Sequence, residues 1–295
     1  MKKFLSLVVI FLVVSFALFQ QSNKPDHSLF YIKGNDFYQL MKSDDSFVFP
    51  IPFWVIKNKV STGEYPINYN ETLLAVIQKM LKGTRVIRKI TIPEGYTVKR
   101  IVEKLNNNRL LFGKITKIPT EASLMPNTYF YTFGNAKEHI INQMANEMKK
   151  ITSEIERENK TSLSTKEILI LASIIEKETG NIEEMPMISS VYHNRLKINM
   201  RMQSDPTVIY AISDYYGKID RKLTRKDLFF KSPYNTYRNA GLPPEAICCP
   251  GKNAIYAAMF PKQTDYLYFV ANKEKTAHLF AKNFKEHLKN KPKNN

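Results

Sequence analysis

The clearest pattern of hydrophobic and polar positions begins at Ser164. The sequence Ser164-Thr165-Lys166-Glu167 is a capping box, in which the serine hydroxyl accepts from the amide of Glu167 and the glutamate side chain reaches back. From Ile168 to Ile175 nearly every position is apolar, so a helix here would be apolar around almost its whole circumference. The pattern therefore predicts a helix that starts after Ser164 and is surrounded by other elements.

Charged residues enter this predicted helix at its end, where Glu176, Lys177 and Glu178 precede Gly180. At about 100° per residue, Glu176 and Glu178 lie on different flanks of the apolar stripe, and periodicity alone does not decide between them. Burial disfavours the charged form of a glutamate, which raises its pKa and suits a general acid near neutral pH. The alternative is a structural carboxylate at the helix end, paired with Lys177 or Arg195.

Upstream, from about residue 29 to residue 115, short strand patterns alternate with helical ones, which is typical of a small α+β module. Glycines mark the expected turns at Gly34, Gly63, Gly83 and Gly95. Asn70 is expected to cap a helix that runs to Leu81, with Gly83 in the position of its C-terminal cap.

The end of this region shows a strand pattern at Lys89 to Pro93, a turn at Gly95, and apolar positions Ile101 and Leu105 at helical spacing. A strand, a turn and a short helix are therefore expected in quick succession. This order, over Ile92-Pro93-Glu94-Gly95-Tyr96-Thr97-Val98, resembles half of a LysM glycan-binding module. The alternative is an ordinary α+β spacer that binds no glycan.

The N-terminus carries Lys2 and Lys3, followed by an apolar run from Phe4 to Phe19 that two serines interrupt. As a helix the run reaches about 24 Å, a little short of a hydrocarbon core of ~30 Å. Residues 1–22 are therefore predicted to form a signal-anchor membrane helix, with a cleaved signal peptide as the alternative. The paired lysines favour a cytoplasmic N-terminus and an exported remainder.

The composition narrows the choice of partners. The chain has 295 residues, of which 43% are hydrophobic, enough for a buried core in one large or two smaller domains. Its formal net charge of +17 suits nucleic acid, anionic lipid or an acidic polymer. The basic residues are spread along the chain without an arginine-rich block or zinc-finger spacing, so nucleic acid is not an expected partner. The histidines lack metal-ligand spacing and the adjacent Cys248 and Cys249 lack partner ligands, so neither a metal nor a cofactor is expected.

Several unusual segments follow the predicted helix in a fixed order. They are Val191-Tyr192-His193-Asn194-Arg195-Leu196, Met202-Gln203-Ser204-Asp205-Pro206-Thr207-Val208-Ile209-Tyr210, Ser232-Pro233-Tyr234-Asn235-Thr236-Tyr237, Gly241-Leu242-Pro243-Pro244 and Asp265-Tyr266-Leu267-Tyr268-Phe269-Val270-Ala271. Together with Ala172-Ser173-Ile174-Ile175-Glu176-Lys177-Glu178-Thr179, they closely resemble the endolytic murein transglycosylase, or YceG-like, family. The resemblance covers roughly Leu124 to His287 and is weaker upstream.

This resemblance implies cleavage of the β-1,4 bond between N-acetylmuramic acid and N-acetylglucosamine within a peptidoglycan strand, leaving a 1,6-anhydro end. The catalytic glutamate of the family falls on Glu176, as a single acid and base, with Glu178 as the alternative or as a neighbour that tunes it. Peptidoglycan strands are the implied substrate, and peptidoglycan synthases of the penicillin-binding type are the expected partners. The implied location is the inner membrane, with the catalytic domain in the periplasm.

Further site residues are expected from the same resemblance. Gln203, Ser204, Asn235 and Tyr237 match family positions near the active cleft, where they would orient acetamido sugars; loop architecture is the alternative for each. Asp205 is either a second carboxylate or an N-cap followed by Pro206 at the first helical position, and the cap is favoured. Asn194 and Arg195 are expected to hold the helix end that bears Glu176, with a surface arginine as the alternative.

The fold expected from these observations is α+β. It comprises an N-terminal membrane helix over residues 1–22, a small LysM-like α+β module over residues 23–115, and an α+β catalytic domain over residues 116–295.

Overall fold

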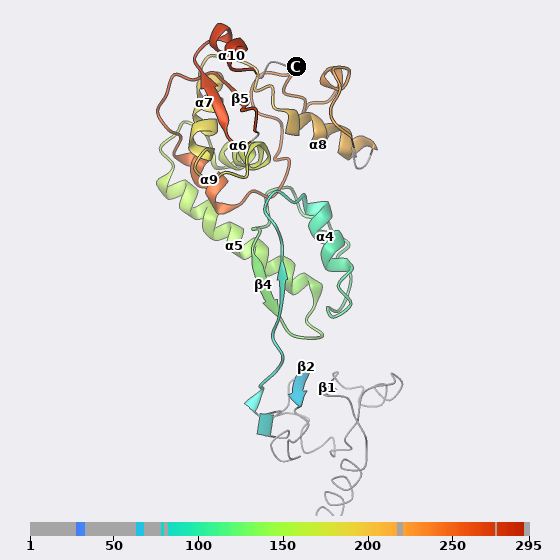
Figure 1. Cartoon of the computed structure of the whole chain (residues 1–295). Coiled ribbons are helices and arrows are strands. Elements are labelled where there is room, and N and C mark those ends of the chain that lie inside the picture. Colours follow the sequence, from blue (N-terminus) through green and yellow to red (C-terminus); the bar gives the residue numbers. More distant parts are fainter. Residues whose placement is uncertain are drawn as a thin grey trace, which may run out of the picture. The chain divides into compact units, whose positions relative to one another are not determined.

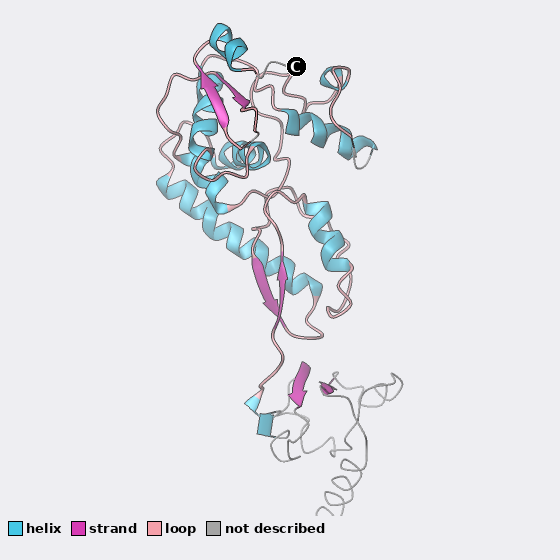
Figure 2. Cartoon of the chain, viewed as in Figure 1, coloured by secondary structure: helices cyan, strands magenta, loops and turns pink. Residues whose placement is uncertain are grey.

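A computed structural model describes residues 28–32, 63–67, 78, 79, 82–216, 221–274 and 276–291. These residues contain both helices and small two-stranded sheets (Figure 2), so the predicted α+β class is confirmed. The chain divides into two compact units. One consists of residues 1–90, 108–113 and 130–136, and the other of residues 91–107, 114–129 and 137–295.

In the first unit, strand β1 (Ser28–Ile32) pairs antiparallel with β2 (Gly63–Ile67). Glu64 of β2 is buried, and Arg88 binds both of its carboxylate oxygens, with Nε 2.6 Å from Oε2 and Nη2 2.9 Å from Oε1. A bidentate pair of this kind satisfies a carboxylate that would otherwise be buried without a partner.

Gly83 closes a helical turn in this unit. Its φ is +70°, and the amide of Thr84 donates to the carbonyl of Lys79 at 3.0 Å, which is the bond that characterises a Schellman cap. The predicted C-terminal cap at Gly83 is therefore confirmed. The rest of the helix predicted from Asn70 to Leu81 lies outside the described residues, apart from positions 78 and 79.

The strand, turn and helix predicted around Gly95 are present. Strand β3 (Arg88–Thr91) forms a two-stranded sheet with β4 (Thr128–Tyr131), and helix α4 (Val98–Asn106) follows within a few residues. The side chain of Thr97 caps α4, accepting from the amide of Arg100 at 3.3 Å. The likeness of this segment to a LysM module stays a prediction.

The second unit is mainly helical. Besides α4, its elements are α5 (Lys137–Glu158), α6 (Thr165–Glu178), α7 (Met185–Lys197), α8 (Asp205–Tyr216), a 3₁₀ turn (Asp227–Phe229), α9 (Lys252–Met259), the antiparallel hairpin of β5 (Tyr268–Ala271) and β6 (His278–Ala281), and α10 (Phe284–Asn290). Helix α6 packs against α5, α7, α8 and α9, and Figure 1 shows it among them.

Helix α6 starts as its sequence predicts. The hydroxyl of Ser164 accepts from the amide of Glu167 at 3.3 Å, and Glu167 Oε2 accepts from the amide of Ser164 at 2.8 Å. Ile168, Leu171 and Ile175 on one face of the helix are buried, and so are Ile170 and Ile174 on the opposite face. The predicted central helix and its capping box are therefore confirmed.

Within the described part of the chain, no helix has the length and apolar character that crossing a bilayer requires. The predicted membrane helix over residues 1–22 lies outside the described residues. The predicted boundary near residue 115 and the topology across the membrane stay predictions.

Replacement of Ser164 by alanine tests the helix start. S164A removes the oxygen that accepts from the Glu167 amide, so the free energy of unfolding should fall by about 1 kcal/mol. Denaturant unfolding measures this loss, with S162A, an exposed serine two residues earlier, as the control. Equal stability of S164A and S162A would contradict the role of the cap.

Candidate active site

Glu176 lies in the last turn of α6 and is partly buried. Its Oε2 accepts a hydrogen bond from the backbone amide of Gly251 at 2.9 Å. Gly251 is the N-cap residue of α9, so the carboxylate faces the positive end of that helix. Oε1 forms no hydrogen bond within the described residues and is the oxygen free to meet a ligand.

The segment before α9 is fixed on α6 by a buried serine. The hydroxyl of Ser173 accepts from the amide of Ile247 at 3.0 Å and donates to the carbonyl of Ile170 at 2.7 Å. The thiol of Cys248 lies 3.4 Å from the carbonyl of Ser173. These contacts fix the position of this segment along α6 and so bring the amide of Gly251 to Glu176.

A second segment, the turn before α4, lies against the same carboxylate. The amide of Gly95 donates to the carbonyl of Cys249 at 3.0 Å, and the amide of Cys249 donates to the carbonyl of Tyr96 at 2.9 Å. Gly95 has a φ of +73°, and a Cβ placed on it would lie 3.6 Å from Cγ of Glu176. The site therefore joins two loops distant in sequence, and a glycine fits both the backbone conformation and the close approach.

Glu94 brings a second carboxylate to this position. A Cβ added to Gly251 would lie 2.0 Å from Oε1 of Glu94, so the Glu94 carboxylate covers the α-carbon of Gly251. The pKa of Glu176 is raised, chiefly by burial and further by the charge of Glu94, while the Gly251 amide and Lys177 act in the opposite direction. Sequence reasoning did not name Glu94 as a site residue.

Glu178 lies on the other flank of α6 in a different environment. Its Oε1 accepts from the hydroxyl of Ser204 at 2.5 Å and from the hydroxyl of Tyr192 at 2.7 Å. Burial raises the pKa of Glu178, the two hydroxyl donors lower it, and the nearby charge of Asp205 raises it again. Glu178 is therefore a partly buried carboxylate held by two hydroxyl donors of the protein.

The loop before α8 supplies two of the predicted site residues. The amide of Gln203 donates to the carbonyl of Thr236 at 3.2 Å, and the amide of Ser204 donates to the hydroxyl of Thr236 at 3.0 Å. Gln203 is exposed and has a φ of +50°, uncommon for a residue with a side chain. Gln203 thus has a strained backbone conformation and an exposed side chain, and it lies next to the buried Ser204.

Helix α8 corrects one expectation. It begins at Asp205, so Ser204 holds the N-cap position, and Pro206 is at the second helical position rather than the first. The prediction that Asp205 is the N-cap is therefore wrong by one residue. The carboxylate of Asp205 instead accepts from the hydroxyl of Tyr237 at 2.6 Å. The hydroxyl of Ser204 donates its proton to Glu178.

Asn235 is fully buried, and its side chain organises a loop. Its amide nitrogen donates to the carbonyls of Leu228 at 3.0 Å and Phe230 at 2.8 Å, and its oxygen accepts from the amide of Tyr237 at 2.9 Å. These contacts agree with the alternative expectation for Asn235, that its side chain stabilises a loop. Through them Asn235 places Tyr237, whose ring is partly exposed.

Arg195 is buried and does not pair with Glu176. Its Nε donates to the carbonyl of Leu267 at 2.7 Å and its Nη1 donates to the carbonyl of Met202. The surface-arginine alternative is therefore wrong. Neighbouring Asn194 donates to the carbonyl of Thr264 at 2.7 Å. These bonds of Asn194 and Arg195 fix the segment before β5, and Arg195 also holds the loop before α8; none of them is to the end of α6 that carries Glu176.

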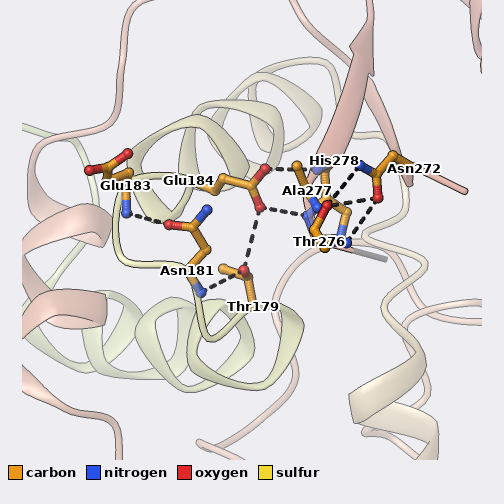
Figure 3. A network of polar contacts seen from close by, with 8 residues as sticks. All are labelled: Thr179, Asn181, Glu183, Glu184, Asn272, Thr276, Ala277 and His278. Atoms are coloured by element: carbon orange, nitrogen blue, oxygen red, sulfur yellow. Dashed lines mark hydrogen bonds and ion pairs between the residues drawn. The ribbon is translucent and has the colours of Figure 1, made fainter. Parts of the chain in front are cut away.

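The turn after α6 is held by a network of its own (Figure 3). Glu184 accepts from the amide of His278 at 2.7 Å, and its Oε2 lies 2.9 Å from Nδ1 of the same histidine. The hydroxyl of Thr179 lies 3.5 Å from Oε2 of Glu184. The network ties the turn between α6 and α7 to strand β6, which limits how far the end of α6 can move.

The predicted site residues thus fall into two groups. Glu178, Ser204, Asp205 and Tyr237 lie around the start of α8, whereas Glu176 lies with Glu94, Gly95 and Gly251 at the start of α9. The second group joins positions more than 150 residues apart in sequence, which periodicity cannot detect. The available signal was the pair of glycines, Gly95 and Gly251, since a glycine often marks the close approach of another group.

Comparison with known proteins identifies the family of the chain. The YceG-like family model matches residues 36–293, and the chain belongs to this family. The predicted family is therefore confirmed.

Individual relatives agree with this assignment. A Bacillus subtilis (strain 168) protein named endolytic murein transglycosylase is 33% identical over 295 residues, covering 89% of this chain and 79% of that protein. A Streptococcus pneumoniae protein of the same name is 28% identical over 78% of this chain, which spans 50% of that longer protein. The crystal structure of a yceG-like protein from Listeria monocytogenes is 34% identical and covers 81% of this chain and 89% of its own, with a TM-score of 0.57.

The buried state of Glu178 predicts a pH dependence of stability. Its pKa in the folded protein is raised above the ordinary value of 4.5, so folding favours the protonated form. The free energy of unfolding of the wild type should therefore fall as the pH rises from about that value through the raised pKa. E178Q keeps an oxygen for both hydroxyl donors but cannot ionise, so its stability relative to the wild type should increase over this window.

Chemical unfolding at a series of pH values measures this difference. E183Q, which removes the same charge at an exposed position in the turn after α6, is the control and should show no such dependence. A stability difference between E178Q and the wild type that is constant with pH, or that falls as the pH rises, would contradict the assignment.

Proposed function

We propose that this chain is an endolytic peptidoglycan transglycosylase, which cleaves the β-1,4 bond between N-acetylmuramic acid and N-acetylglucosamine within a glycan strand. Family membership and the relatives named endolytic murein transglycosylase support this function. The single observation that carries the assignment of the acid is the environment of Glu176: partly buried, bonded to the amide of Gly251 through one oxygen, and free at the other.

In the first step, protonated Glu176 donates its proton to the oxygen that leaves with N-acetylglucosamine. The bond between that oxygen and C1 of the muramic acid breaks, and positive charge develops at C1. Burial favours the neutral carboxyl that this step requires. The amide of Gly251 then stabilises the carboxylate that the transfer leaves on Glu176.

In the second step, the C6 hydroxyl of the same muramic acid attacks C1, and Glu176 takes the hydroxyl proton. The product carries a 1,6-anhydro bond, the glutamate regains its starting proton, and no water is consumed. An ordinary glycosidase needs two carboxylates at a set separation. Here the substrate supplies the nucleophile, so one acid and base is sufficient.

Glu178 fits this role less well. Its Oε1 already accepts from two hydroxyl groups of the protein, those of Ser204 and Tyr192, so this oxygen is engaged within the protein. We assign Glu178 and Ser204 to the support of the substrate site. Gln203, Asp205 and Tyr237 at the same edge are suited to contact the acetamido sugars, and Asn235 acts by holding Tyr237 in place.

The remaining features of the proposal concern location and partners. Residues 1–22 would anchor the chain in the inner membrane with its N-terminus in the cytoplasm, which the apolar run and the paired lysines support. The LysM-like segment would hold glycan near the bilayer. Cleavage of nascent strands beside a penicillin-binding synthase would then terminate their elongation.

The substitution E176Q tests the function and the role together. The wild-type chain incubated with uncross-linked glycan should release muropeptides with 1,6-anhydro ends, identified by mass spectrometry. Because Gln cannot transfer the proton, E176Q should keep its circular dichroism spectrum and lose at least ~10²-fold in rate. E183Q provides the control for loss of one negative charge near the end of α6.

Two results would contradict the proposal in different ways. Hydrolysed ends, or binding of glycan without any product, would exclude transglycosylation by the wild type and favour a glycosidase or a binding scaffold. Full activity of E176Q together with an inactive E178Q would move the acid to Glu178.

A further inference from the structure

Glu94 stands out because its carboxylate occupies a space that the neighbouring backbone leaves open. Its Oε1 would lie 2.0 Å and its Cδ 2.2 Å from a Cβ at Gly251. The amide of that same glycine donates to Oε2 of Glu176. One residue without a side chain therefore separates two carboxylates, and any larger residue at position 251 would displace Glu94.

We propose that Glu94 is a positioning residue for the proposed transglycosylase, whose negative charge above Gly251 keeps Glu176 protonated until the glycosidic bond is cleaved. The inference rests on the proposed function of Glu176. Two neighbouring carboxylates resist being ionised together, so the charge of the exposed Glu94 opposes ionisation of the partly buried Glu176. The same charge makes Glu176 a stronger base in the second step.

The turn that carries Glu94 is held firmly enough for this role. The amide of Gly95 donates to the carbonyl of Cys249 at 3.0 Å, and the amide of Cys249 donates to the carbonyl of Tyr96 at 2.9 Å. The amide of Val98 donates to both carboxylate oxygens of Glu121, at 3.1 and 3.0 Å. The backbone next to Glu94 is therefore fixed by hydrogen bonds and holds Glu94 at the site, although the Glu94 side chain is exposed.

Other charged and titratable groups also surround Glu176 and bear on its ionisation. Lys177, on the same helix, favours the carboxylate and lies 3.4 Å from the carbonyl of Gly95. Cys248, from the segment before α9, stays neutral because burial raises the pKa of its thiol. The amide of Gly251 at the start of α9 also favours the carboxylate. Glu94 is the neighbouring charge that opposes these groups.

The pH dependence of kcat/KM tests the inference, because it reports the ionisation of groups in the free enzyme. The rate of anhydro-muropeptide formation is measured with the full chain. In E94Q the alkaline limb, where Glu176 loses its proton, should move to lower pH. Each unit of displacement lowers the rate about tenfold at pH values above both limbs. E94D keeps the charge and should keep the limb closer to that of the wild type.

Gly251 offers an independent route to the same result. Its φ of −78° and ψ of 170° are accessible to alanine, and G251A retains the amide that binds Glu176. The added methyl group displaces the Glu94 carboxylate, so G251A should reproduce the displacement seen in E94Q. The double variant E94Q/G251A should show no further displacement, since the charge is already absent. E103Q removes a glutamate from an exposed position of α4 and is the charge control.

The outcomes separate this inference from the proposed function. A wild type that forms no anhydro product would overturn both. An active wild type whose alkaline limb coincides with that of E94Q would overturn the role of Glu94 alone. A uniform loss of rate in E94Q at every pH would also overturn it, because it would indicate a structural effect. If circular dichroism shows that E94Q does not fold, G251A is the deciding variant. An alkaline limb of G251A at lower pH than that of the wild type supports the role of Glu94, and an alkaline limb at the same pH contradicts it.

Discussion

The constraint on which this structure depends is the apolar circumference of α6. Buried side chains surround the helix, so neighbouring elements must cover it on every side, as α5, α7, α8 and α9 do. Covering the end of α6 with α9 brings the first amide of α9 to Glu176. The hydrophobic effect thus decides where the carboxylate lies, and a single backbone hydrogen bond decides how it points.

The two glutamates at the end of α6 show how position on a helix determines chemistry. Oε1 of Glu178 accepts from the hydroxyls of Tyr192 and Ser204, so this oxygen is engaged by two donors of the protein. Glu176 faces a helix start and a second carboxylate and keeps one oxygen free. Two residues of the same type, two positions apart, therefore have different capacities to exchange a proton with a substrate. The difference lies in their partners, since burial raises the pKa of both.

Local signals made the central parts of the fold predictable. The capping box at Ser164, the glycine cap at Gly83 and the strand, turn and helix around Gly95 depend on residues close in sequence, and the structure confirms each. The start of α8 was misplaced by one residue because Asp205 and Ser204 are both good capping residues and stand next to each other in the sequence.

Long-range contacts explain what the sequence did not reveal. Glu94 meets Gly251 only because backbone hydrogen bonds hold the turn at Gly95 against Cys249, and no periodicity records that contact. Buried Arg195 was equally hard to place, since its partners are carbonyls of distant loops. Segment patterns identify elements and family, whereas the surroundings of a carboxylate depend on tertiary packing.

The central claim is that Glu176 is a carboxyl group kept protonated by its surroundings. Its most direct test is an NMR titration of the side-chain carboxyl carbon of Glu176 in the wild-type chain, assigned by comparison with E176Q. The account predicts a midpoint above the ordinary value of 4.5. A midpoint at or below that value would contradict it, because Glu176 would then be ionised before it could protonate the leaving sugar.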